Sequence, residues 1–217
     1  MLFVAWQLWW TTIEANRTQQ EAVHSLTQQF NTSADTGKHS ASNYDSTNPP
    51  LTQTPAYGQA YGVVYIPRLG ETYARPLAEG TGNDVLDTLG LGHYADSQPL
   101  GEFGNFALAG HRQTNGAVLD HIDKLQKGDN IYIQTNEGYY TYRVYESKIV
   151  LPQQVEVIAP DPGNPDAPAA AATRRLLTLT SCHPRYGDTE RYIVHAEFMN
   201  WQPNEAGAPA EIAKAAS

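Results

Sequence analysis

Three side chains that together could perform acyl transfer stand at the ends of three strand-like runs of residues. Cys182, the only cysteine, ends the run 178–182, and Arg191 begins a second run nine residues later. His111 ends a third run, 105–111, far upstream. A thiolate is a nucleophile, an imidazole can act as general acid and base, and a guanidinium can bind a developing oxyanion. These three residues are therefore the candidate site of a cysteine acyl-transfer enzyme.

Strand geometry gives these residues an expected arrangement. Runs 176–182 and 191–198 are joined by a short loop, so they are expected to pair as an antiparallel hairpin with Cys182 opposite Arg191. An arginine beside a cysteine favours the thiolate. The residues that share a face with His111 on its own run are mostly small, which leaves a concave surface beside the imidazole.

Other interpretations of these residues stand beside the catalytic one. A lone cysteine is often a buried hydrophobic residue, Arg191 could form a surface ion pair, and His111 could be a strand-end histidine bonded to loop backbone. His195 shares the face of Arg191 and is the rival general base, whereas His183 is expected to point away from the thiol. No carboxylate stands out as the third member of a relay.

Composition limits the chain to one sizeable domain with additional segments. It has 217 residues, of which 41% are hydrophobic, enough for one core. A formal net charge of -9, with no basic patch, argues against a nucleic-acid partner. A single cysteine excludes an intramolecular disulfide. We expect no metal, because Asp120, His121 and Asp123 lack the ligand spacing of zinc motifs. We expect no organic cofactor either, because acyl transfer by a cysteine, a histidine and an arginine requires none.

The first 60 residues carry no chemical motif. The apolar run 1–10 is too short to span a bilayer, which needs about 20 residues. We expect it to be the outer end of a membrane helix; the alternative is an amphipathic segment that packs on the domain or lies on a membrane. Anchor and following helix are assigned to 1–30, and the Ser-, Thr-, Asn-, Gln- and Pro-rich segment 31–60 to a polar stalk. Without residues 1–60 the domain is expected to remain soluble and active.

Turn residues divide the region 61–203 into seven or eight short strand-like runs. Short helices are expected at 84–90 and 117–125, and a loop at 92–104. The Pro- and Ala-rich segment 160–173 is expected to be a mobile loop that could cover a bound peptide. The small, polar tail at 204–217 is expected to be flexible. This pattern is typical of a mainly β protein, a closed barrel of about eight strands with a few short helices.

Three groups of residues in this order resemble the sortase family. The run TLTSC, which ends at Cys182 and precedes Arg191, is similar to the sortase TLxTC signature with its arginine some nine residues on. GNFALAGHR, with LQKGD at 125–129, is similar to the sortase histidine strand and its continuation, and VYIP at 64–67 to the first sortase strand. The likeness covers roughly 62–200.

Features around the cysteine and ahead of the histidine strand resemble the class E sortases of actinobacteria. These are Gly92-His93-Tyr94 and Cys182-His183-Pro184. Two positions depart from the class pattern: Ser181 replaces the usual threonine, and Asn115 stands where class E members often carry an aromatic residue.

The resemblance implies a cysteine transpeptidase that cuts an LAXTG- or LPXTG-type sorting signal between Thr and Gly. Cys182, His111 and Arg191 would be catalytic, and Tyr94, Thr180 and Ser181 would bind substrate. Its partners would be sorting-signal peptides of secreted proteins and a peptidoglycan precursor amine. The catalytic domain would lie outside the cell on a single-pass N-terminal membrane anchor. The alternatives are a hydrolytic cysteine peptidase with the same site and a non-catalytic surface β-barrel with a buried cysteine.

Overall fold

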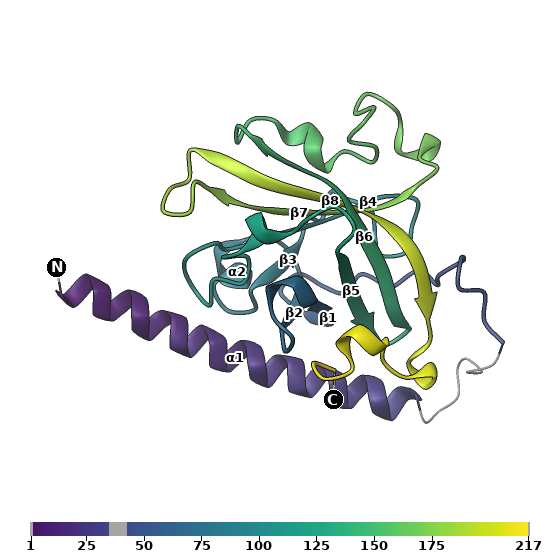
Figure 1. The fold of residues 1–217 in the computed structure, drawn as a ribbon, viewed down its shortest axis with the longest axis horizontal. Coiled ribbons are helices and arrows are strands. Elements are labelled where there is room, and N and C mark those ends of the chain that lie inside the picture. Colours follow the sequence, from purple (N-terminus) through teal and green to yellow (C-terminus); the bar gives the residue numbers. More distant parts are fainter. Residues whose placement is uncertain (1, 35–42, 217) are drawn as a thin grey trace.

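Eight strands close into a barrel, as the sequence predicts (Figure 1). The structure is a computed structural model that describes residues 2–34 and 43–216. The order around the barrel is β1-β2-β3-β4-β7-β8-β6-β5, and β5 closes the circle on β1. Among the strands of the described ranges, only β2 with β3 and β4 with β7 pair in parallel. The helices and strands are α1 (Leu2–Ala34), β1 (Ala60–Tyr65), β2 (Ala74–Glu79), α2 (Asn83–Leu86), β3 (Leu91–His93), β4 (Gly104–Gly110), β5 (Asn130–Thr135), β6 (Gly138–Val150), β7 (Arg175–His183) and β8 (Glu190–Gln202).

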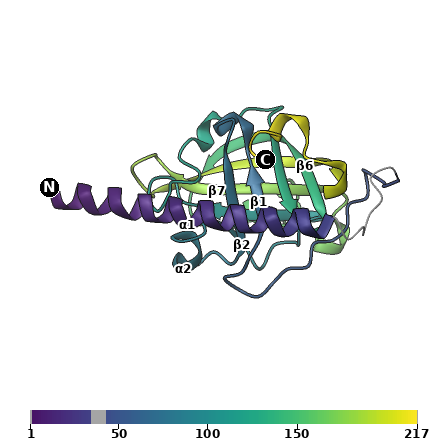
Figure 2. The ribbon, with the colours of Figure 1, turned by 90° about the horizontal axis from the view of Figure 1, so that it is seen from below.

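Strand β1 is apolar on both faces because both faces are covered. Val64 points into the barrel core, whereas Val63 and Tyr65 belong to a second apolar cluster on the outer wall. Leu26 and Phe30 of α1 complete that outer cluster. Figure 2 shows α1 lying across β1 and β2 on this side of the barrel. The helix is therefore a layer of the folded domain and not only a connection to it.

The described part of the predicted stalk also contacts the barrel. The Tyr140 hydroxyl of β6 donates to the carbonyl of Pro50 at 2.8 Å and lies 3.0 Å from the Thr52 hydroxyl. The Trp201 amide of β8 donates to the carbonyl of Ser46 at 2.8 Å. Residues 43–59 contain no regular helix or strand, and these bonds hold them along the barrel. Removing 1–60 would therefore expose apolar and polar surface that is now covered.

The C-terminal segment packs in the same region. Ile212 is buried in the outer cluster of β1 and α1, and the Tyr132 hydroxyl of β5 donates to Glu211. Lys214 pairs with Glu71. The expectation of a flexible tail is therefore wrong for the part that includes Ile212.

Two elements of the barrel differ from their sequence predictions. The predicted loop 92–104 begins inside strand β3, where His93 is buried and its Nδ1 lies 2.7 Å from the Glu79 carboxylate. The predicted helix 117–125 is only a 3-10 turn at Ile122–Lys124. Within the described ranges 2–34 and 43–216, no helix combines the length and the apolar character that crossing a membrane requires.

We expect Phe30→Ala to destabilise the protein by about 3–5 kcal/mol, because it removes a fully buried aromatic ring between α1 and the barrel wall. Ile13→Ala on the same helix is the control, since Ile13 is 45% exposed and should change stability by less than about 0.5 kcal/mol. Denaturant unfolding of both variants measures the difference. Equal stabilities would mean that α1 is a tether and not a layer of the domain.

Candidate active site

The parallel pairing of β4 with β7 brings the histidine to the cysteine. Ala109 pairs with Thr180, so two residues further along both strands lead to His111 and Cys182 at the same edge of the barrel. The Ser181 hydroxyl donates to the carbonyl of Gly110 at 2.8 Å. This bond connects β4 and β7 one residue beyond their last backbone pair. A cleft at this edge, called here the cysteine cleft, is lined by His111, Arg112, Gln113, Thr114, Cys182, Tyr186, Gly187 and Asp188.

The predicted hairpin of β7 and β8 is confirmed, with Cys182 paired to Arg191. The Arg191 guanidinium donates through Nη1 to the carbonyls of Asp188 at 2.7 Å and Glu190 at 2.8 Å. These bonds hold the cation against the β7–β8 loop. Cys182 is partly exposed, which excludes the interpretation of a buried core cysteine.

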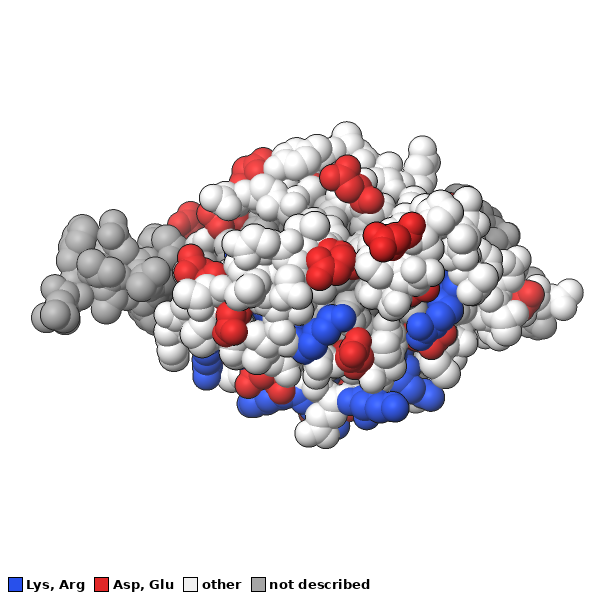
Figure 3. Space-filling model, turned by 90° about the horizontal axis from the view of Figure 1, so that it is seen from above, with Lys and Arg blue, Asp and Glu red and all other residues white. Residues whose placement is uncertain are grey.

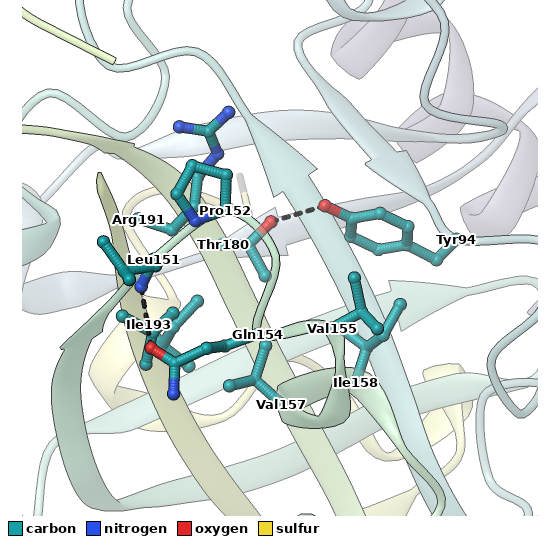
Figure 4. Close-up of a pocket in the computed structure, with 11 residues that line it drawn as sticks. Tyr94, Leu151, Pro152, Gln154, Val155, Val157, Ile158, Thr180, Arg191 and Ile193 are labelled. Carbon is teal, nitrogen blue, oxygen red and sulfur yellow. Dashed lines mark hydrogen bonds between the residues drawn. The ribbon is translucent and has the colours of Figure 1, made fainter. Parts of the chain in front are cut away.

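A mainly apolar pocket lies beside Arg191 (Figure 4). The connection between β6 and β7 supplies most of its wall, and in the figure Val155 and Ile158 lie near the phenol ring of Tyr94. The Tyr94 hydroxyl is 2.9 Å from the Thr180 hydroxyl. The lining residues are Tyr94, Val150, Leu151, Pro152, Gln154, Val155, Val157, Ile158, Thr180, Arg191 and Ile193.

The pocket revises two expectations about substrate contacts. Thr180 shares the face of Cys182 on β7 because side chains alternate along a strand, whereas Ser181 points the other way and is buried against Gly110. Ser181 therefore supports the strand and does not reach the pocket. The predicted covering segment 160–173 supplies none of the described lining residues, and 150–158 occupies that place.

A carboxylate that the sequence did not indicate lies beside the histidine. The Oδ1 atom of Asp87, just after α2, is 2.6 Å from Nε2 of His111. An ionised carboxylate accepts hydrogen bonds and donates none, so the contact assigns a proton to Nε2 and leaves Nδ1 as the second nitrogen. The expectation that His111 has no carboxylate partner is wrong.

Arg112, directly after His111, connects the end of β4 to the end of β7. It is buried, its Nη1 lies 2.7 Å from Nδ1 of His183, and it contacts the carbonyl of Cys182 at 3.4 Å. Its Nη2 pairs with Asp123 at 3.0 Å, and its guanidinium lies over the ring of Tyr192. Asp120 forms an ion pair with Arg185. Both carboxylates of the candidate metal ligands Asp120, His121 and Asp123 therefore bind arginines.

His195 cannot serve as the base, because it is fully buried on the outer face of β8, opposite the barrel core that Val194 and Ala196 join, and it does not line the cysteine cleft. Its Nδ1 lies 2.8 Å from the oxygen of the Thr178 hydroxyl, and that hydroxyl donates its one proton to the side-chain oxygen of Asn105 at 2.8 Å. Burial lowers the pKa of His195 to about 4, with a smaller contribution from Lys148, so its imidazole is neutral at pH 7. Of the two rival bases, only His111 lines the cysteine cleft.

Residues 64–199 match the sortase domain family. The chain belongs to the sortase family. It is 31% identical over 216 residues to sortase SrtE1 of Streptomyces coelicolor, which covers 96% of this chain and 56% of that protein. The chain thus spans little more than half the length of that relative.

Solved sortases share the barrel. SrtA from Actinomyces oris is 43% identical with a TM-score of 0.71, over 76% of this chain and 93% of that one. Sortase E from Streptomyces avermitilis is 41% identical with a TM-score of 0.65, over 73% of this chain and 99% of that one. The predicted likeness to class E sortases is confirmed.

Sequence reasoning missed two residues of this sortase site. Asp87 lies 24 positions from His111, and no motif connects them. Arg112 carried a signal, since a charged residue directly after a strand of small residues can fold back against the end of the neighbouring strand, but strand-end arginines are usually exposed.

His111→Ala should lower kcat by a factor of about 10²–10⁴, the usual contribution of a general acid and base. His195→Ala should leave kcat of the folded protein within about threefold and lower its melting temperature, because it leaves a buried cavity between β7 and β8 on their outer face. Steady-state kinetics with one sorting peptide, with thermal unfolding alongside, measures both. A similar loss of kcat in the two variants would contradict the assignment of His111.

Proposed function

We propose that this protein is a cysteine transpeptidase of the sortase type. It would cleave a sorting signal of the LAXTG or LPXTG type between Thr and Gly and transfer the new carboxyl end to a cell-wall amine. The observation that carries the proposal is the shared cleft of His111 and Cys182, with Arg191 paired across from the cysteine. Membership of the sortase family supports the same reaction.

The residues of the cleft divide the reaction as follows. The Cys182 thiolate attacks the threonine carbonyl carbon, and the developing oxyanion accepts hydrogen bonds from Arg191. The protonated His111 gives its proton to the nitrogen of the departing glycine, which leaves a thioacyl bond on Cys182. An incoming amine then attacks that thioester and gives a proton to His111. The new amide departs and the thiolate is restored.

Asp87 orients His111 in this scheme. Its carboxylate accepts from Nε2, which fixes the tautomer and directs Nδ1 to the proton transfers at the cysteine cleft. The carboxylate is partly exposed and does not touch the thiol in this assignment, so Asp87 is a positioning residue.

The pocket beside Arg191 would receive the leucine side chain of the signal. It is bounded by Val155, Ile158 and Ile193, and it adjoins Cys182 through Thr180 on the same face of β7. An extended peptide advances about 3.3 Å per residue, so its leucine lies roughly 10 Å before the threonine that meets the thiol. Tyr94 and Thr180 line the path between these two positions.

The acceptor and the cellular location complete the proposal. Figure 3 shows acidic side chains scattered over the face seen from above, with most Lys and Arg side chains in its lower half. With a formal net charge of -9, the protein favours a cationic acceptor such as a peptidoglycan amine. The N-terminal end of α1 projects beyond the barrel in Figure 1 and would lead to a membrane anchor, with the domain outside the cell.

Mass spectrometry of the protein mixed with LAXTG- and LPXTG-type peptides should find a thioacyl adduct on Cys182. Cys182→Ala should retain the fold and less than about a thousandth of the cleavage rate, because the nucleophile is gone. Adding an amine should convert the cleaved peptide into an amide product. Free acid alone, even with amine in excess, would identify a hydrolytic peptidase, and no adduct with either peptide would contradict covalent catalysis.

Tyr94 should set a preference for LAXTG over LPXTG. A proline ring in the signal would meet the phenol and lacks a backbone N–H, so kcat/KM should favour LAXTG by about tens-fold, or 1–3 kcal/mol. Tyr94→Leu should abolish most of this preference, and Tyr94→Phe, which keeps the ring, separates bulk from hydroxyl. If Tyr94→Leu keeps the full preference, Tyr94 only packs on the barrel.

A further inference from the structure

One polar side chain of α1 is buried where the helix passes the active-site loops. Gln19 is fully buried, and its Nε2 donates to the carbonyl of Asn115 at 3.2 Å. The other buried residues among the described side chains of α1 are apolar: Ala15, Leu26 and Phe30. A carboxamide in this stripe costs desolvation, and its Oε1 has no hydrogen-bond partner in the described structure, so packing of the helix alone does not explain it.

Two glycines let the loops close around this carboxamide. Gly90 and Gly116 both adopt positive φ, at +90° and +88°. A Cβ atom on Gly116 would lie 2.8 Å from both Oε1 and Nε2 of Gln19, and one on Gly90 would lie 3.0 Å from Nε2. The amide group of Gln19 therefore fills the space between two loops that come from different parts of the chain.

These two loops carry the histidine and its carboxylate. Gly90 follows Asp87 by three residues, and Gly116 follows His111 by five. The histidine loop is also strained, because Asn115 and Ala117 flank Gly116 with φ of 49° and 46°. Strain of this kind persists only where the surroundings hold the backbone in place. The bond from Gln19 to Asn115 is one such restraint.

We infer that Gln19 is a positioning residue of the active site, a contact through which α1 holds the loops of Asp87 and His111 in register. This role rests on the proposed transpeptidase function. In the intact protein the Gln19 carboxamide fixes the distance between the two loops, and the Asp87–His111 contact of 2.6 Å depends on that distance. Without the carboxamide the loop at Asn115 relaxes and the imidazole leaves its productive orientation.

Three variants of the full chain test the inference. Gln19→Ala removes the carboxamide that contacts the two loops. Gln20→Ala is the matched control, because it removes the same kind of side chain from the neighbouring exposed position. Phe30→Ala weakens the packing of the other end of α1 on the barrel. Gln19→Ala should lower kcat about tenfold with KM for the sorting peptide changed less than about twofold, because a displacement of about 1 Å in a reacting group can cost up to a hundredfold in rate. Phe30→Ala should lower the melting temperature more than Gln19→Ala while kcat of the folded protein is kept.

Two measurements without substrate separate this inference from the proposed function. Amide hydrogen exchange at Ala117 and Leu119, which donate to Thr114 and His111 in the loop, should become about tenfold faster in Gln19→Ala and stay unchanged in Gln20→Ala. The ring signals of His111 in NMR spectra should shift only in Gln19→Ala. The wild type could transfer no peptide while both the amide exchange and the His111 ring signals change in Gln19→Ala. In that case the proposed function fails and the positioning role stands.

The inference is overturned if Gln19→Ala matches Gln20→Ala in exchange and ring signals. It is also overturned if amide hydrogen exchange changes in Gln19→Ala while kcat of an active enzyme does not. Gln19 would then hold the loop without affecting the function of His111. A loss of kcat in Phe30→Ala equal to that in Gln19→Ala would show general weakening of α1 and would overturn it as well.

Discussion

The parallel pairing of β4 with β7 is the constraint on which the site depends. Parallel strands end at the same edge of a sheet, so a histidine after one strand and a cysteine near the end of the other come together although they lie far apart in the chain. The antiparallel partner β8 then sets Arg191 beside Cys182. A slip of one residue between β4 and β7 would turn the thiol to the opposite face.

Buried polar groups keep that register from slipping. Thr178 and Asn105 are paired with each other on the outer face of β7 and β4, beneath the β6–β7 connection, Ser181 is bonded to Gly110, and Arg112 contacts the carbonyl of Cys182. Such groups are costly to bury unless they are satisfied, and a satisfied set favours one arrangement over its neighbours. Each of them joins the histidine strand to the cysteine strand, so these buried polar groups and the reactive edge form one unit.

The sequence predicted what is local and missed what is brought together by topology. The β7–β8 hairpin follows from strand alternation and loop length, and the eight-stranded barrel from turn spacing. Asp87 reaches His111 only through the path of the chain between them, which no periodicity encodes. The packing of α1 on the barrel wall was not predicted, because a mostly polar helix has the composition of a connecting segment. A signal existed there, since Gln19 falls on the same stripe as Ala15, Leu26 and Phe30.

The attachment of the pocket wall has a consequence for how this protein could change over evolution. Asn105 holds the β6–β7 connection by donating to the carbonyls of Val157 at 3.2 Å and Ala159 at 3.0 Å. Because main-chain carbonyls are present whatever the side chains are, mutations in the wall can alter its shape without losing this attachment. Recognition and chemistry are thus separable traits: a lineage, or a protein engineer, can exchange the wall for another sequence while the reacting groups are inherited unchanged.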